Sequence, residues 1–194
     1  MSSSQRPPDA ASGRQQHRRE GPRALGVALI TVSDSRSGAS DHSGALAERL
    51  LLAAGHHLVA RHLVPDDPER IEGAVLGALA TVDCSAVILT GGTGVSPRDR
   101  TPEVLAGLWE RELPGFGEFF RRLSWEEIGS AAMLSRACAG LREGRLLVAL
   151  PGAPAAVRLG LERLLLPELG HLVGQLRRVE GAQREGRPLD EEPA

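Results

Sequence analysis

The sequence predicts an α/β fold, a three-layer α/β/α sandwich in which a mostly parallel sheet lies between two layers of helices. Short apolar runs alternate with longer amphipathic stretches between residues 24 and 178. Such alternation is typical of strand–helix units that build a parallel sheet. Most of the apolar runs are continuous, as expected for strands that helices cover on both faces.

The 194 residues suit one domain flanked by two tails. With 41% hydrophobic residues, the chain can bury a real core. Residues 1–23 are rich in Ser, Gln, Pro and Arg and have few large apolar side chains, so we expect a disordered N-terminal tail. Residues 24–178 hold the domain. Residues 179–194, which are polar and rich in Gly, Pro and acids, are expected to form a flexible C-terminal tail.

Apolar runs and helix boundary signals define the expected elements. Asp67 caps a helix with Pro68 in its first turn, and Gly55 ends the helix before it. The expected strands cover residues 25–32, 58–64, 86–90 and 145–150. The expected helices cover residues 43–54, 67–80, 101–110, 115–123, 129–139, 154–166 and 167 to about 178.

Composition argues against a nucleic-acid or membrane partner. The net charge is -2 and aromatic residues make up 3% of the chain, so neither a basic field nor a set of stacking platforms is available. All 23 basic residues are Arg, which removes every lysine-based mechanism. The apolar stretch at 24–32 is too short to span a bilayer. We therefore expect a cytoplasmic protein.

The cysteines and histidines give no metal-binding pattern. Cys84 and Cys138 lie far apart in apolar surroundings, which favours two reduced buried thiols over a disulfide or a metal pair. His56, His57 and His62 cluster around one strand, but their spacing places no defined trio on one face. A zinc site is therefore not expected.

Three expected strands end in loops of unusual composition. These loops cover residues 31–36, 91–99 and 150–154, and each leads into a helix. Ligands of open α/β sheets bind at the carboxyl ends of the strands. The three loops are therefore expected to converge on one site.

The loop Gly91-Gly92-Thr93-Gly94-Val95-Ser96-Pro97-Arg98-Asp99 has the composition of a phosphate cradle. Its glycines permit positive φ and let backbone N–H groups approach an anion ahead of a helix N-terminus. An ordinary tight turn between strand and helix would explain the glycines equally well. The spacing differs from a dinucleotide fingerprint, and the lysine of a nucleoside-triphosphate loop is missing.

Two acidic positions next to these loops are candidates for phosphoryl-transfer chemistry. Asp99 would hold Mg²⁺ or orient a nucleophile; alternatively, Asp99 or Thr101 caps the next helix. In the pair at 66–67 we assign the helix cap to Asp67, which leaves Asp66 free. Asp66 and Asp99 on neighbouring loops would then share a Mg²⁺ that bridges nucleotide phosphates.

Four motifs follow each other along the chain. They are the loop at 91–99, Glu112-Leu113-Pro114-Gly115-Phe116-Gly117-Glu118, Ala132-Met133-Leu134-Ser135-Arg136 and Pro151-Gly152-Ala153-Pro154. Together they resemble the MoaB/MogA molybdopterin-binding family, most closely its MoaB-type branch, and the resemblance covers about residues 24 to 178. The chain departs from the family pattern at Ala153 and Ala155, where polar residues are more usual.

The resemblance implies a homo-oligomer, a trimer or hexamer, that binds molybdopterin and transfers AMP from Mg²⁺-ATP to its terminal phosphate. Asp66 and Asp99 match the family's two essential aspartates, and thus the catalytic and Mg²⁺-binding positions. The expected substrate-binding residues are Ser33, Asp34, Gly91, Gly92, Thr93, Gly94, Ser96, Ser135, Arg136, Pro151 and Gly152. Other molybdenum-cofactor enzymes are possible partners. The alternatives are a non-catalytic molybdopterin carrier and a generic nucleotide-binding module.

Overall fold

The computed structural model describes residues 22, 24–36 and 38–184, which fold around one six-stranded sheet. The strand order is β2-β1-β3-β6-β5-β4. The first four strands in this order are parallel, and β5 and β4 complete the sheet in antiparallel pairing. The predicted fold class is confirmed.

Most elements follow each other in the order that the sequence predicts; β4 is an added strand, and β5 begins within a segment that was expected to be a helix. The strands are β1 (Gly26–Val32), β2 (His57–Val64), β3 (Cys84–Thr90), β4 (Arg111–Glu112), β5 (Cys138–Arg142) and β6 (Arg145–Leu150). The helices are η1 (Gly38–Ser40), α2 (His42–Ala53), α3 (Pro68–Leu79), α4 (Thr101–Leu108), α5 (Pro114–Ile128), η2 (Gly129–Leu134), α6 (Pro154–Leu159), η3 (Gly160–Leu165) and α7 (Leu166–Arg184).

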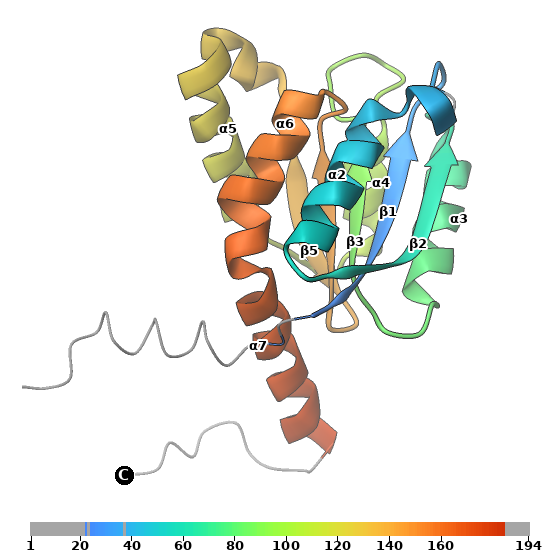
Figure 1. Cartoon of the computed structure of the whole chain (residues 1–194), viewed down its shortest axis with the longest axis vertical. Helices are drawn as coiled ribbons and strands as arrows, with labels where there is room; N and C mark the ends of the chain where they lie inside the picture. The colour runs from blue at the N-terminus through green and yellow to red at the C-terminus, as the bar shows by residue number, and fades with distance from the viewer. Residues whose placement is uncertain (1–21, 23, 37, 185–194) are drawn as a thin grey trace, which may run out of the picture.

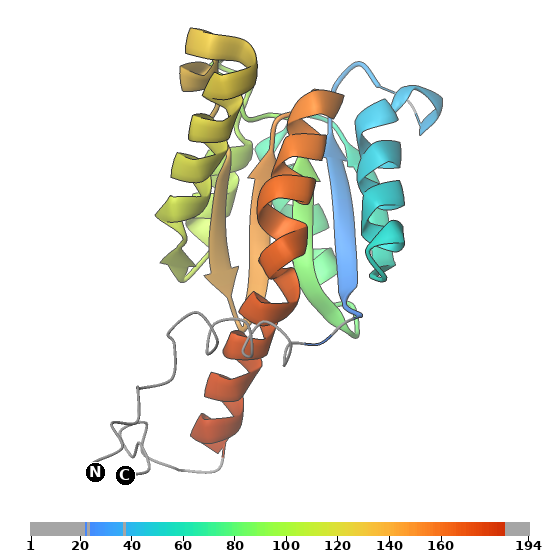
Figure 2. The ribbon, with the colours of Figure 1, turned by 60° about the vertical axis from the view of Figure 1, so that its left-hand side comes forward.

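Helices cover both faces of the sheet (Figures 1 and 2). Helices α2, α5, α6 and α7 pack on one face, where Leu51, Phe120 and Leu161 join the inward side chains of the strands. Helices α3 and α4 cover the other face through Ile71 and Leu105. Strands β1 and β3 are buried along their whole length, which explains their continuous apolar sequences.

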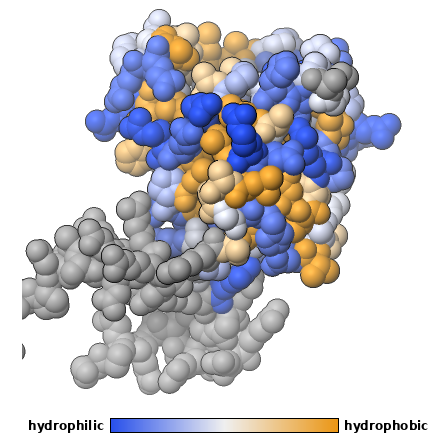
Figure 3. Space-filling view, in the orientation of Figure 1, coloured by the Kyte–Doolittle hydropathy of each residue, from blue (hydrophilic) through white to orange (hydrophobic). Residues whose placement is uncertain are grey.

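The chain reverses direction across the sheet between β1 and β3. From β1 it turns through α2 to the edge strand β2, and from β2 it crosses through α3 to β3 on the other side of β1. This change creates a crevice at the carboxyl ends of β1 and β3, the usual place for a ligand in such sheets. The outer surface seen in Figure 3 carries both polar and apolar side chains.

The expected helix at residues 129–139 is wrong. Gly129 adopts φ 60° and ends α5, a short 3₁₀ turn follows, and the chain then enters β5. Glu143 and Gly144, both at positive φ, turn β5 back into an antiparallel hairpin with β6. Local propensity favours a helix here, but pairing with β6 decides the outcome.

The expected end of the last helix, near residue 178, is also too early. Helices 154–166 and 167–178 form one path through a π-helical segment, and α7 continues to Arg184. Extending an existing helix costs little compared with starting one. The remaining tail residues, 1–21, 23 and 185–194, lie outside the described part of the chain. No described helix is long and apolar enough to cross a membrane.

Candidate functional site

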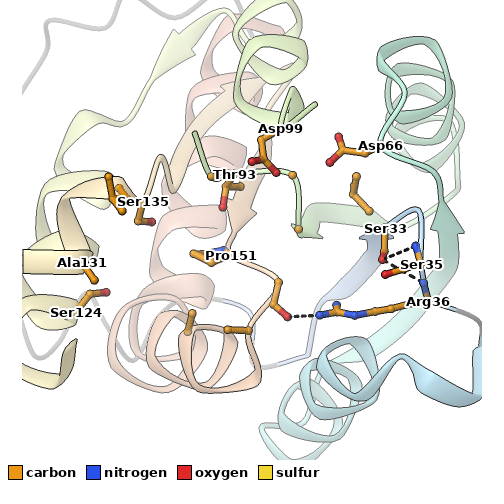
Figure 4. Close-up of a pocket in the computed structure, with 18 of the residues that line it drawn as sticks. Ser33, Ser35, Arg36, Asp66, Thr93, Asp99, Ser124, Ala131, Ser135 and Pro151 are labelled. Atoms are coloured by element: carbon orange, nitrogen blue, oxygen red, sulfur yellow. Dashed lines mark hydrogen bonds between the residues drawn. The ribbon is translucent and has the colours of Figure 1, made fainter. Parts of the chain in front are cut away.

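A cavity of about 570 Å³ opens at the carboxyl ends of β1, β2, β3 and β6 (Figure 4). One side consists of polar loops that follow the strands. The other side is formed by α5, η2 and the start of α6. The three loops that the sequence singled out therefore converge as predicted, and they are joined by a wall of helical residues.

Asp66 and Asp99 lie at one end of the cavity (Figure 4). Oδ1 of Asp66 is buried and has no hydrogen-bond partner. The pKa of Asp66 is raised, chiefly because burial disfavours the charged form; repulsion from Asp99 and Asp34 adds to this, and a hydrogen bond from the backbone N–H of Arg100 opposes it. A buried carboxylate oxygen without a donor is suited to bind a cation.

The helix caps show which aspartates have a structural role and which do not. Asp67 caps α3 by accepting a hydrogen bond from the backbone N–H of Arg70 at 3.0 Å, as predicted. Asp99 does not cap α4, whose N-terminus has no side-chain cap. Its Oδ2 instead accepts from the backbone N–H of Ser96 at 2.9 Å. Asp66 and Asp99 are thus both spared from capping.

Asp34 completes a cluster of three carboxylates. Its Oδ1 accepts from the backbone N–H of Asp66 at 3.0 Å, which ties the end of β1 to the end of β2. Its Oδ2 lies 2.7 Å from Arg98 Nη2, but this pair is exposed and contributes little to stability. Asp34 therefore helps to place Asp66 and adds negative charge beside it.

The glycine loop needs its glycines for close approach. Gly91 and Gly92 adopt φ 107° and 62°, a region that other residues rarely occupy. A Cβ on Gly91 would clash with the carbonyl oxygen of Val32, and one on Gly92 would clash with Thr101 Oγ1. Thr101 Oγ1 also donates to the Gly91 carbonyl at 3.0 Å. The loop is thereby pressed against β1 and the start of α4.

Arg36 was not among the predicted site residues. Its Nη2 donates to the Gly152 carbonyl at 2.9 Å, and Ser43 Oγ donates to the same oxygen (Figure 4 shows the Arg36 bond). Ser33 Oγ accepts from the backbone N–H of Arg36 at 3.3 Å. Of the described residues that line the cavity, Arg36 is the only cation. Its position in a loop that follows a strand was the sequence feature that could have identified Arg36 as a site residue.

The far half of the cavity is mostly apolar. Phe120 and Ile128 from α5 line it together with Leu134, and Ser124 and Ser135 add hydroxyl groups. Figure 4 shows Ser124, Ala131 and Ser135 on the opposite side of the cavity from Arg36 and Asp66. Apart from Ser135, the residues of this wall were not predicted as site residues, because their pattern is that of ordinary helix positions. Its apolar lining suits an organic ring, while polar groups of a ligand would face the loops on the other side.

Most predicted site residues line the cavity, with two exceptions. Those that line it are Ser33, Asp34, Asp66, Gly91, Gly92, Thr93, Gly94, Asp99, Ser135, Pro151 and Gly152. Ser96 and Arg136 do not. Ser96 supports Asp99 through its backbone, and the Arg136 side chain bonds Glu103 and the loop carbonyls of Gly94 and Asp99.

The charges favour a ligand bound together with a cation. Among the described residues, three carboxylates and one guanidinium line the cavity, so an anion alone would be repelled at the acidic end. Among described residues, no group of three His, Cys, Asp or Glu side chains is preformed around a metal position. Mg²⁺ is commonly held by one or two carboxylates together with substrate phosphates, and Asp66 and Asp99 fit that arrangement.

Comparison with known proteins decides the family. Residues 28–171 match the family model described as a probable molybdopterin binding domain. The chain belongs to the MoaB family. The molybdenum cofactor biosynthesis protein B of Halalkalibacterium halodurans is 42% identical over 163 residues, which cover 84% of this chain and 96% of that protein.

Solved MoaB structures share the fold. A crystal structure of a molybdenum cofactor biosynthesis protein B has a TM-score of 0.79 at 42% identity and covers 82% of this chain and 99% of its own. The molybdopterin biosynthesis enzyme MoaB of Thermus thermophilus has a TM-score of 0.70 at 34% identity, with 78% and 96% covered. The MoaB assignment confirms the family resemblance seen in the sequence.

Proposed function

We propose that this MoaB-family protein binds molybdopterin and transfers AMP from Mg²⁺-ATP to its terminal phosphate. An oxygen of the pterin phosphate attacks the α-phosphorus of ATP, and a new P–O–P link forms. The bond between the α-phosphorus and the β-phosphate oxygen breaks, so that pyrophosphate leaves. Both reactants are anions, and the reaction needs them in line with their charges screened.

The buried, unpartnered Oδ1 of Asp66 beside Asp99 and the glycine loop carries this proposal. A protein that only carried the pterin would not need both the Asp66 and the Asp99 carboxylate next to the phosphate of the pterin. The raised pKa of Asp66 records the cost of that arrangement. A bound cation would offset the cost, because it replaces repulsion between the carboxylates with attraction to both.

Each part of the cavity has a distinct role in the proposal. Asp66 and Asp99 would hold Mg²⁺, which supplies screening of phosphate charge and polarisation of the reacting phosphorus. The backbone N–H groups of the loop at 91–94 orient a phosphate, and Arg36 neutralises charge at the β1 side. The apolar wall at Phe120 and Leu134 excludes water and accepts the pterin ring.

The test is incubation of the purified protein with molybdopterin and Mg²⁺-ATP, with pyrophosphate release followed and adenylylated pterin identified by mass. In Asp66→Asn and Asp99→Asn we expect pyrophosphate release to fall about 100-fold or more, with pterin affinity much less affected. Asp67→Asn is the matched control, because Asn also caps a helix and residue 67 does not line the cavity.

The carrier function is the alternative outcome of the same experiment. Tight pterin binding without any product from the wild-type protein would replace the adenylyltransferase with a carrier. Equal loss of turnover and pterin binding in the two Asn variants would refute the separate roles given to the carboxylates. A trimeric or hexameric assembly, and contacts with other molybdenum-cofactor enzymes, stay predictions for solution measurements.

A further inference from the structure

Arg136 lies in the link between η2 and β5, directly after Ser135 of the cavity wall. Its side chain is 33% exposed, and the residue does not line the cavity. The family resemblance placed it among the substrate ligands. Its contacts in the structure point to a different role.

The Arg136 residue binds the glycine loop at several points. Its backbone N–H donates to the Thr93 carbonyl at 3.0 Å, and its Nε donates to the Gly94 carbonyl at 2.7 Å. Its Nη2 donates to the carbonyl of Asp99. One side chain therefore fixes both ends of the segment that separates Gly94 from Asp99.

The hydrogen bond from Arg136 to the Asp99 carbonyl connects Arg136 to both candidate catalytic carboxylates. The Asp99 carbonyl and the Arg100 N–H belong to one planar peptide unit, so fixing one group fixes the other. The N–H of Arg100 lies close enough to the Asp66 carboxylate to lower its pKa. The peptide that Arg136 holds thus carries the Asp99 side chain and acts on the Asp66 carboxylate.

Glu103 holds the guanidinium in place from the first turn of α4. It accepts a hydrogen bond from Arg136 Nη1. Burial alone would raise the pKa of Glu103, but the hydrogen bond and charge of Arg136, together with the backbone N–H of Glu103 and the charge of Arg100, outweigh it, and the pKa is lowered. With these contacts, each of the three guanidinium nitrogens of Arg136 donates to a protein acceptor.

We infer that Arg136 is a positioning residue that sets the separation of Asp66 and Asp99 and ties it to the cavity wall at Ser135. The inference rests on the proposed adenylyl transfer, in which that separation matters. The planar fork of the guanidinium reaches three acceptors at fixed angles, which the single ammonium of Lys does not reproduce. A positive charge at position 136 is therefore not sufficient to hold the glycine loop.

The experiment compares Arg136→Lys, Arg136→Ala and Glu103→Gln with the wild-type protein in steady-state kinetics. For both Arg136 variants we expect kcat to fall about 10- to 100-fold, as is usual when a supporting contact of a metal site is lost. KM for molybdopterin should stay within about threefold of wild type, as for a group that does not bind the substrate. Glu103→Gln should lower kcat less. Arg158→Ala, which breaks only an exposed ion pair between α6 and η3, should change neither constant.

A second readout needs no turnover. Hydrogen exchange of the backbone N–H groups between residues 94 and 101 should be about tenfold faster or more in Arg136→Lys and Arg136→Ala, because the loop loses anchors. A raised KM with unchanged kcat, or full activity in Arg136→Lys, would overturn the inference and make Arg136 a charge-based ligand. If the wild-type protein forms no product, the proposed function fails, and unchanged exchange in the variants would separately refute the positioning role.

Discussion

Removal of the buried carboxylate of Asp41 should destabilise the domain at the base of the site. Asp41 is 3% exposed and caps α2 by accepting from the backbone N–H of Gly44 at 2.9 Å. Its Oδ2 accepts from Thr31 Oγ1 at 2.7 Å and from Arg61 Nη2 at 2.9 Å. The residue therefore joins β1, β2 and α2 just below the loop at 33–36.

The cost of Asp41→Ala follows from these three contacts. Loss of the helix cap costs about 1 kcal/mol. The Thr31 hydroxyl, which is fully buried, loses its acceptor at about 1–3 kcal/mol. Arg61 is 36% exposed and keeps Glu48 at 3.2 Å, so its share is about 0–1 kcal/mol. The expected loss is about 3 kcal/mol, or roughly 6–12 °C in Tm for a domain of this size.

Urea unfolding and a thermal melt would measure this effect, with Glu48→Ala as the matched control. Glu48 pairs with the same Arg61 but is 37% exposed, so its removal should cost less than about 1 kcal/mol. Asp41→Asn, which retains a cap and an acceptor, should fall between the two. Equal stability of Asp41→Ala and Glu48→Ala would refute the reasoning, because it would mean that burial of the network contributes nothing.

Three further predictions concern the site and the thiols. Asp66→Asn should raise the free energy of unfolding at pH 7 in metal-free buffer. The gain in stability should shrink as the pH falls through the raised pKa of Asp66, because the native carboxyl is itself protonated there. A gain that is independent of pH would contradict this cause. Gly92→Ala, at φ 62°, should cost about 1–3 kcal/mol in urea unfolding, whereas Gly107→Ala, with open space around its Cβ, should be neutral or stabilising by up to about 1 kcal/mol. Burial raises the pKa of Cys84, and that of Cys138 to about 12; both thiols should therefore resist alkylation at pH 8 until the protein unfolds, and rapid labelling of the native protein would contradict this.

The sequence by itself determined the parallel part of the sheet and the acidic end of the site. Continuous apolar runs mark β1 and β3, and strong local signals such as the cap at Asp67 and the glycines at 91–94 fix the loops that follow strands. Because parallel strands present their carboxyl ends at one edge of the sheet, the sequence alone predicted that Asp66 and Asp99 lie in one site.

Only the tertiary structure decided which residues form the cavity wall opposite Asp66 and Asp99. Strand β5 has a weak local preference and exists because β6 pairs with it, so the segment after Gly129 could not be assigned from its own residues. The hydrogen bonds of Arg36 to Gly152 and of Arg136 to Gly94 and Asp99 join residues distant in the chain. Periodicity and capping report the neighbourhood of a residue along the chain, whereas these contacts depend on how the layers pack around the sheet.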